Sequence, residues 1–218
     1  MKPAPFRYLA ARTIDEAVAA LHEHAGEARV LAGGQSLVPL MNMRLATPEM
    51  LVDINRIADL EYVRAWDGGV AIGAMTRDIT LEHDREAALR LPLLVEASAC
   101  VGHPAIRNRS TVGGSIAQAD PAAELPAVMM ALDAQIVARG PSGERTITAA
   151  DFFSAIYRQH WNPMSCWWSC ACRGCRPAQA VPLSSSPAAR ATTPWPGLRR
   201  RWPWPPTARS AMRAWRCA

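Results

Sequence analysis

The sequence predicts a mixed α/β (α+β) fold over roughly its first 157 residues. Amphipathic stretches with helix-capping residues alternate along this part with short apolar runs that are typical of buried strands. A chain of 218 residues, half of them hydrophobic, is long enough for one or two domains. No apolar run approaches the ~18 residues of a membrane span, and the first residues lack a signal-peptide core. We therefore expect a soluble, cytoplasmic protein without a membrane span.

Helices and strands are predicted in order along the first half. Thr13 and Glu16 have the spacing of a capping box, and the residues after them place apolar side chains on one helical face. Asp67-Gly68-Gly69 is a good hairpin turn. The expected elements are a helix from residue 14 to Gly26, a strand at 28–32, a helix at 37–45, a strand at 50–54, a short connection at 57–60, and hairpin strands at 62–65 and 70–72.

The second half repeats the mixture. Gly102-His103-Pro104 breaks the chain, and we expect an extended segment at 106–110 before a second glycine-rich stretch. The other expected elements are helices at 80–89, 93–101 and 125–132, and strands at 134–138 and 145–147.

The composition changes abruptly near residue 158. Residues 1–158 carry 15 basic and 19 acidic groups, whereas residues 159–218 carry nine Arg and no Asp, Glu or Lys. Seven of the eight Trp and five of the six Cys also lie in the later segment. The net charge of +5 therefore describes neither part, and it is not read as a sign of nucleic-acid binding.

The later segment has the composition of GC-rich DNA translated in the wrong frame. Taking the third base of each codon with the first two of the next converts residues 160–176 into Leu-Glu-Pro-Asp-Glu-Leu-Leu-Val-Glu-Leu-Arg-Leu-Pro-Arg-Leu-Pro, which contains a strand pattern. Residues 190–197 can likewise become Gly-Asp-Tyr-Ala-Leu-Ala-Gly. We interpret residues 158–218 as a frameshifted tail, not a native domain, with the switch near residues 157–159.

Two features of this tail have an alternative interpretation. The cysteines Cys166, Cys170, Cys172 and Cys175 have a metal-ligand spacing, and an Arg-rich, Trp-rich run at 199–204 resembles a nucleic-acid surface. Shifted leucine codons explain the cysteines, and the same frameshift explains the basic run. We therefore predict no metal site and no nucleic-acid partner, and keep a metal-binding or nucleic-acid-binding module as the alternative.

The residues best suited to chemistry are two Gly-Gly segments, each beside a small hydroxyl residue. They are Ala32-Gly33-Gly34-Gln35-Ser36 and Thr111-Val112-Gly113-Gly114-Ser115. Glycine lets backbone N–H groups approach an anion, and Ser and Thr add hydroxyl donors. Two such segments could clamp a diphosphate, or each could be a tight turn. Neither matches the GxGxxG or P-loop pattern.

A resemblance decides between these interpretations. VLAGGQSLVPLMNMRL, LVDINRI, IGAMTR and GHPAIRNRSTVGGSIAQADPAAELP occur in this order. They resemble the FAD-binding medium subunit of carbon monoxide dehydrogenase-type molybdenum hydroxylases, which is similar to the flavin domain of xanthine dehydrogenases. The resemblance runs from about residue 5 to residue 157, and the recovered tail peptides look like the family's continuation.

The resemblance implies a vanillyl-alcohol-oxidase (PCMH)-type FAD-binding fold of two α/β lobes, at residues 1–57 and 58–157, with the C-terminal domain missing or frameshifted. Both Gly-Gly segments would hold the FAD diphosphate, Leu37 and Ile106 would pack on the cofactor, and Glu124 would accept hydrogen bonds from its ribose or adenine. Ser115 replaces an Asn found in many relatives. The family's Gly-Asp-Tyr segment near the flavin is Thr192-Thr193 in the chain as written.

The implied role is electron transfer, without a catalytic acid, base or nucleophile of the chain's own. FAD would receive electrons from an iron–sulfur small subunit and pass them to an acceptor, beside a molybdopterin large subunit, in a dimer of heterotrimers. Two alternatives remain: a truncated, inactive remnant of such a subunit, and a stand-alone flavin oxidase. His103 and Arg107, just before the second segment, are expected to brace it.

Overall fold

The first sheet is small and entirely parallel. The computed structural model describes residues 2–66 and 69–153 and, as backbone alone, residues 166–173. The sheet consists of β1 (Arg7–Ala10), β3 (Met50–Asp53) and β2 (Ala28–Leu31), in that spatial order. Leu31 is opposite Asp53, so the carboxyl ends of β2 and β3 lie side by side. The helices of this region are α1 (Ile14–Glu23), α2 (Leu37–Asn42) and the 3-10 turn η1 (Ala58–Leu60).

The sequence-predicted first helix is confirmed, and its start follows from local hydrogen bonds. The Thr13 hydroxyl accepts from the Glu16 N–H at 3.1 Å, and the Glu16 carboxylate accepts from the Arg12 N–H at 2.8 Å. The apolar face of α1 is buried in one core with the strands, which includes Ile14, Val18, Leu21, Val52, Ile57 and Leu60.

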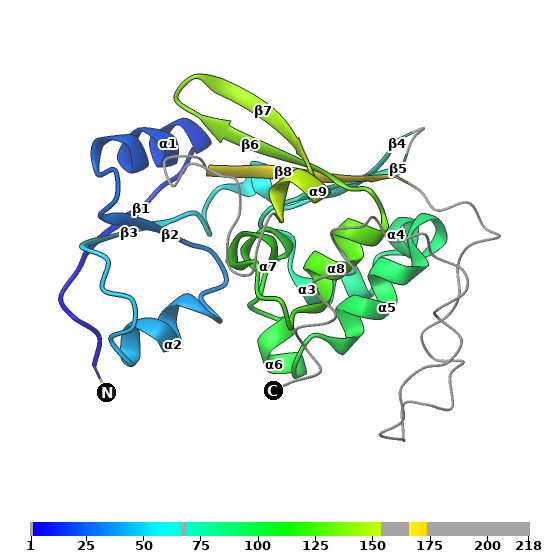
Figure 1. The fold of residues 1–218 in the computed structure, drawn as a ribbon, viewed down its shortest axis with the longest axis horizontal. Coiled ribbons are helices and arrows are strands. Elements are labelled where there is room, and N and C mark those ends of the chain that lie inside the picture. The colour runs from blue at the N-terminus through cyan, green and yellow to red at the C-terminus, as the bar shows by residue number, and fades with distance from the viewer. Residues whose placement is uncertain (1, 67–68, 154–165, 174–218) are drawn as a thin grey trace. The chain divides into compact units, whose positions relative to one another are not determined.

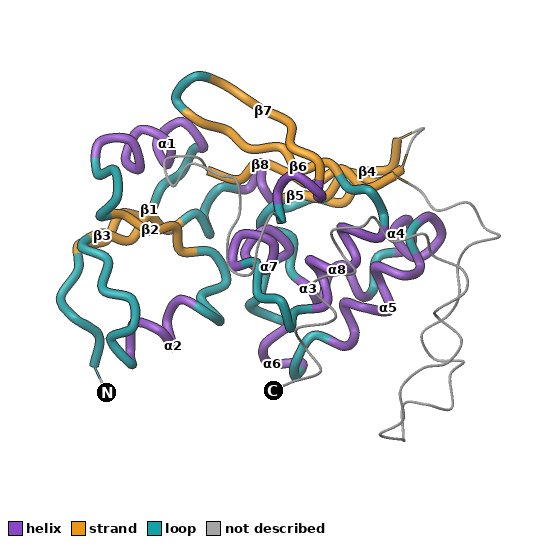
Figure 2. Tube along the Cα trace, viewed as in Figure 1, coloured by secondary structure: helices purple, strands orange, loops and turns teal. Residues whose placement is uncertain are grey.

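The second sheet has five strands, and every neighbouring pair is antiparallel. Its order is β4 (Val63–Trp66), β5 (Gly69–Gly73), β8 (Cys166–Arg173), β6 (Gln135–Gly140) and β7 (Gly143–Thr148). Helices gather on one side of it (Figures 1 and 2), and six of them follow one another along the chain between β5 and β6. The helices of this region are α3 (Asp78–Glu82), α4 (Arg85–Arg90), α5 (Pro92–Cys100), α6 (Pro104–Arg107), α7 (Val112–Gln118), α8 (Glu124–Ala131) and α9 (Ala149–Phe152).

A second hydrophobic core lies between this sheet and its helices. Its fully buried members include Ile72, Leu94, Met129, Ile136 and Phe152. Each buried side chain of this size contributes about 1.5–3 kcal/mol relative to exposure, so this core dominates the stability of the region. The mixed α/β class predicted from the sequence is confirmed, whereas the lobe boundary at residue 57 stays a prediction.

Three predicted details differ from the structure. The expected helix at 80–89 is split at Asp84, whose carboxylate caps α4 by accepting from the Ala87 N–H at 2.8 Å. The expected extended segment at 106–110 is wrong, because residues 104–107 form the helical turn α6. Strand β1 was not expected, since its exposed residues show no alternation and it depends on pairing with β3.

Part of the acid-free tail belongs to the second sheet. β8 is its central strand, paired with β5 on one side and β6 on the other. The cysteine side chains of β8, Cys175 and the Arg-rich run all lie outside the described residues. Among the residues that the structure does describe, no three metal-ligating side chains cluster, and no helix has the length and apolar character of a membrane span.

Candidate cofactor-binding site

The first Gly-Gly segment leaves the carboxyl end of β2 with its backbone donors free. Gly34 has φ +74°, a left-handed conformation that glycine adopts at little cost. Within the part of the chain that the structure describes, the N–H groups of residues 33–36 donate no hydrogen bond. The Gln35 side chain donates to the Gly33 carbonyl at 3.1 Å, which holds the turn. The segment therefore presents a short row of donors suited to an anion.

The second Gly-Gly segment is not the loop that the sequence analysis expected. It is the first turn of α7, and the Thr111 hydroxyl caps this turn by accepting from the Gly114 N–H at 3.1 Å. The N–H groups of Val112, Gly113 and Ser115 donate to the carbonyls of Thr76, Ala74 and Thr111 at 2.9–3.0 Å. Its backbone donors are thus used inside the protein. Toward a ligand the segment presents the hydroxyl of Ser115, which is half-buried, and Gly114, whose lack of a side chain lets a ligand come close to the backbone.

The first segment lies against the second and against the two residues that precede it. A Cβ on Gly33 would lie 2.2 Å from the Arg109 carbonyl oxygen and 2.8 Å from the Ser110 Cα. A Cβ on Gly114 would lie 3.8 Å from the Ala32 Cβ. Residues nearly eighty positions apart in the sequence therefore form one surface, as a clamp around one ligand requires.

A buried carboxylate, which the sequence alone did not indicate, binds the residue just before the second segment. Asp78 is fully buried; one carboxylate oxygen accepts from the Ser110 hydroxyl at 2.5 Å, and its N–H donates to the Ser110 carbonyl at 3.3 Å. The other oxygen, Oδ1, has no partner among the described residues. Burial raises the pKa of Asp78 to about 6, against the lowering effect of the Ser110 hydrogen bond and of Arg107.

The remaining sequence-predicted residues surround these segments less closely. Glu124 begins α8, is half-buried, and contributes to the raised pKa of Asp78. Leu37 begins α2, and Ile106 lies in α6, where its carbonyl accepts from the Ser110 N–H at 2.7 Å. Arg107 pairs with Glu82 at 2.8 Å and donates to the carbonyls of residues 101 and 102, so it holds the turn before α6. That it braces the second segment stays a prediction.

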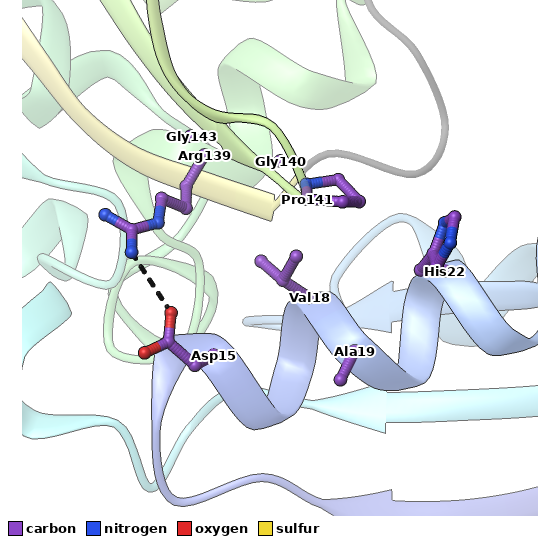
Figure 3. A pocket seen from close by; sticks show the side chains of 8 residues that line it. All are labelled: Asp15, Val18, Ala19, His22, Arg139, Gly140, Pro141 and Gly143. Atoms are coloured by element: carbon purple, nitrogen blue, oxygen red, sulfur yellow. Dashed lines mark hydrogen bonds and ion pairs between the residues drawn. The ribbon is translucent and has the colours of Figure 1, made fainter.

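A pocket between α1 and the β6–β7 turn is a separate feature (Figure 3). Its polar contact is the ion pair between Arg139 and Asp15, at 3.2 Å, and Val18 and Pro141 supply apolar lining. None of the residues of the two Gly-Gly segments lines it. We therefore place the candidate site at the glycines and not in this pocket.

Comparison with known proteins identifies the class to which this site belongs. Residues 4–165 match the family described as the FAD binding domain in molybdopterin dehydrogenase. The chain belongs to this family, and FAD is the cofactor of the domain. The candidate site is thus the part of a flavoprotein domain where a short row of backbone N–H donors lies beside glycines.

Individual relatives are subunits of oxidoreductases. The chain is 48% identical, over 67% of its length and 50% of the relative's, to the 6-hydroxypseudooxynicotine dehydrogenase complex subunit alpha of Paenarthrobacter nicotinovorans. It is 44% identical, over 72% of its length and 55% of the relative's, to the carbon monoxide dehydrogenase medium chain of Hydrogenophaga pseudoflava. The chain therefore spans about half the length of these curated relatives.

Solved structures agree with this assignment. The fold superposes with a TM-score of 0.79 on a chain of the carbon monoxide dehydrogenase from Hydrogenophaga pseudoflava, at 40% identity, covering 81% of this chain and 62% of that one. A chain of quinoline 2-oxidoreductase from Pseudomonas putida 86 gives 0.77 at 34% identity, covering 79% and 60%. The flavin-domain fold inferred from the sequence is confirmed.

Proposed function

We propose that this chain is the FAD-carrying electron-transfer subunit of a molybdenum hydroxylase complex, and that residues 33–36 hold the FAD diphosphate. The observation that carries this proposal is the row of four backbone N–H groups without partners in the described structure, whose first residue, Gly33, lies against Arg109 and Ser110 just before the second segment. A diphosphate carries two negative charges close together, and such charge is favoured where several N–H groups converge.

The two segments divide the work of holding this group. The first segment supplies backbone donors, Gly114 carries no side chain that would hold the ligand away, and the Ser115 hydroxyl donates from the opposite side. Gly113 packs against Ala74 and so lets α7 lie close to the backbone that follows β5. A Cβ on Gly114 would come within 2.8 Å of the Thr111 hydroxyl and disturb the cap. Leu37 and Ile106 would pack on the cofactor, and Glu124 would accept from its ribose or adenine hydroxyl and amino groups.

The proposed role in the cell is to relay electrons. Bound FAD would supply the redox chemistry of this role, and the protein would position the cofactor. The relatives are named for 6-hydroxypseudooxynicotine, carbon monoxide and caffeine, which share little chemistry. This diversity supports a shared flavin subunit beside a molybdopterin large subunit that selects the substrate and an iron–sulfur small subunit that delivers electrons. We propose a cytoplasmic dimer of such heterotrimers.

We also propose that residues 159–218 come from a shifted reading frame. The family match ends at residue 165, soon after the change in composition. If one base is missing near codon 158, the restored frame places Leu at positions 170 and 172 and Arg at 171. Position 170 is opposite Ile72 and Ile136, and position 172 is opposite Val70, all three fully buried. Position 171 is opposite half-buried Ala71 and Gln135.

This register gives the restored strand a consistent pattern. Cross-strand partners share a face of a sheet, so the restored leucines face the core and the arginine faces away from it. The pattern supports a native strand at this place in the family fold and favours a frameshift over a genuine metal-binding or nucleic-acid-binding tail.

The test is to express both forms, the 218-residue chain and the chain continued in the restored frame, and to measure flavin after desalting. We expect about one FAD per folded chain and copurification of two further subunits when the complex is co-expressed. A soluble, folded protein without flavin would refute the proposal. If the 218-residue chain is insoluble while the restored chain carries flavin, the 218-residue chain is an inactive remnant. Stoichiometric zinc or iron in the 218-residue chain would favour the metal-binding alternative.

A further inference from the structure

Asn55 lies where the first Gly-Gly segment begins. It follows β3, and its side-chain nitrogen donates to the Ala32 carbonyl at 2.9 Å and to the Asp53 carboxylate at 2.6 Å. Its own N–H also donates to this carboxylate, at 2.8 Å. Because two acceptors surround the amide nitrogen, the amide oxygen must point the other way.

Arg77 donates a hydrogen bond to that oxygen and extends the contact toward the second segment. One guanidinium nitrogen donates to the Asn55 side-chain oxygen at 2.7 Å, and the other donates to the Arg109 carbonyl. This carbonyl is the same one that Gly33 approaches most closely. An isolated β-bridge between Arg77 and Thr111 fixes the backbone of Arg77 beside α7.

Together these contacts form a continuous chain, which we call the Asn55–Arg77 bridge. It runs from the Ala32 carbonyl through the two side chains to the Arg109 carbonyl, and so joins the residue before one glycine pair to the residues before the other. Arg77 donates to the two acceptors from two different nitrogens of one rigid plane, whereas a Lys ammonium would have to reach both acceptors from a single nitrogen.

We propose that Asn55 and Arg77 are positioning residues that set the separation of the two Gly-Gly segments and thereby the affinity for the FAD diphosphate. The inference rests on the proposed function, since it assigns a role toward the cofactor that the site holds. The family motifs LVDIN and IGAMTR contain both residues, yet the sequence alone gives neither a reason to meet the other.

The test measures FAD affinity by quenching of flavin fluorescence, for the purified chain and its variants in the restored reading frame and, where it is soluble, in the 218-residue form. Asn55→Ala and Arg77→Gln should each raise the Kd roughly tenfold, the effect of losing one charge-assisted hydrogen bond. The double variant should be little worse than either single one, because both changes break the same bridge. Arg90→Gln, which removes a surface ion pair with Glu86, is the matched control and should leave the Kd unchanged.

Arg77→Lys separates positioning from charge. It keeps the positive charge but lacks the two separate nitrogens that serve the two acceptors, so the bridge predicts a loss as large as that of Arg77→Gln. Wild-type affinity in Arg77→Lys, or independent and multiplying effects of the Asn55 and Arg77 changes, would overturn the inference while leaving FAD binding intact. A wild-type chain that is folded by circular dichroism and binds no FAD would instead refute the proposed function, and this inference with it.

Discussion

Gly33→Ala is the substitution that most directly challenges the contact between the two Gly-Gly segments. The added methyl carbon would lie 2.2 Å from the Arg109 carbonyl oxygen, where ordinary contact begins near 3.4 Å. The segments must therefore separate by more than an ångström or the backbone must distort. Overpacking of this kind costs about 1–3 kcal/mol of folding free energy. Because the separated donors no longer converge, FAD affinity should fall by about two orders of magnitude, more than the bridge variants.

The assay pairs thermal unfolding with flavin titration. Gly26→Ala is the control, since Gly26 has φ +87° with nothing within 4 Å of an added Cβ, so its cost of about 1 kcal/mol is conformational. It should lower the melting temperature without changing FAD affinity. Equal FAD affinities of Gly33→Ala and the wild-type chain would refute the contact between the segments as the basis of the site.

Three further predictions concern the surrounding residues. The pKa of Asp78, raised to about 6 by burial, means that the folded chain binds this proton more tightly than the unfolded chain. The contribution of Asp78 to the unfolding free energy should therefore be largest below about pH 4 and fall by about 3 kcal/mol as the pH rises through 6. Asp78→Asn should remove this contribution, which is read as the difference between variant and wild type in denaturant titrations from pH 4 to 8, and a difference that does not change with pH would contradict the assignment. Thr111→Val removes the cap of α7 and should cost about 1 kcal/mol by chemical denaturation, whereas Thr146→Val, at an exposed position of β7, should cost much less; equal losses would argue against the cap. Restoring the reading frame should raise the melting temperature because leucines replace the residues at positions 170 and 172 opposite the core; an unchanged or lower value would argue against the frameshift.

Local patterns were sufficient to predict much of the fold. The capped helix α1, the hairpin of β4 and β5, and helix α8 follow from caps, turn residues and periodicity within about a dozen residues. Strand β1 could not be found this way, because its stability depends on pairing with a strand more than forty residues away.

The second Gly-Gly segment shows how packing overrides propensity. Glycine is among the poorest helix formers, so a loop was the natural expectation. The segment is helical because Thr111 caps it and because Gly113 lies against Ala74, where a Cβ would come within 2.6 Å. No local signal in the sequence reports that contact.

The site was predictable in its glycines and not in its supporting residues. The paired motifs indicated the segments that meet, and the family resemblance indicated FAD. Asn55, Arg77 and Asp78 act through partners 22 to 32 positions away, which a single sequence does not reveal. One usable signal existed, since Asn55 follows the carboxyl end of a buried parallel strand, where ligands of such sheets are commonly bound.

The central claim is that residues 33–36 hold the diphosphate of FAD, and the flavin content of the purified chain tests it most directly. Chain in the restored frame is purified, desalted and scanned for visible flavin absorbance, with Gly33→Ala treated alike. The account predicts about one FAD per wild-type chain and little in the variant. Folded wild-type protein without flavin, or equal flavin in both, would contradict it.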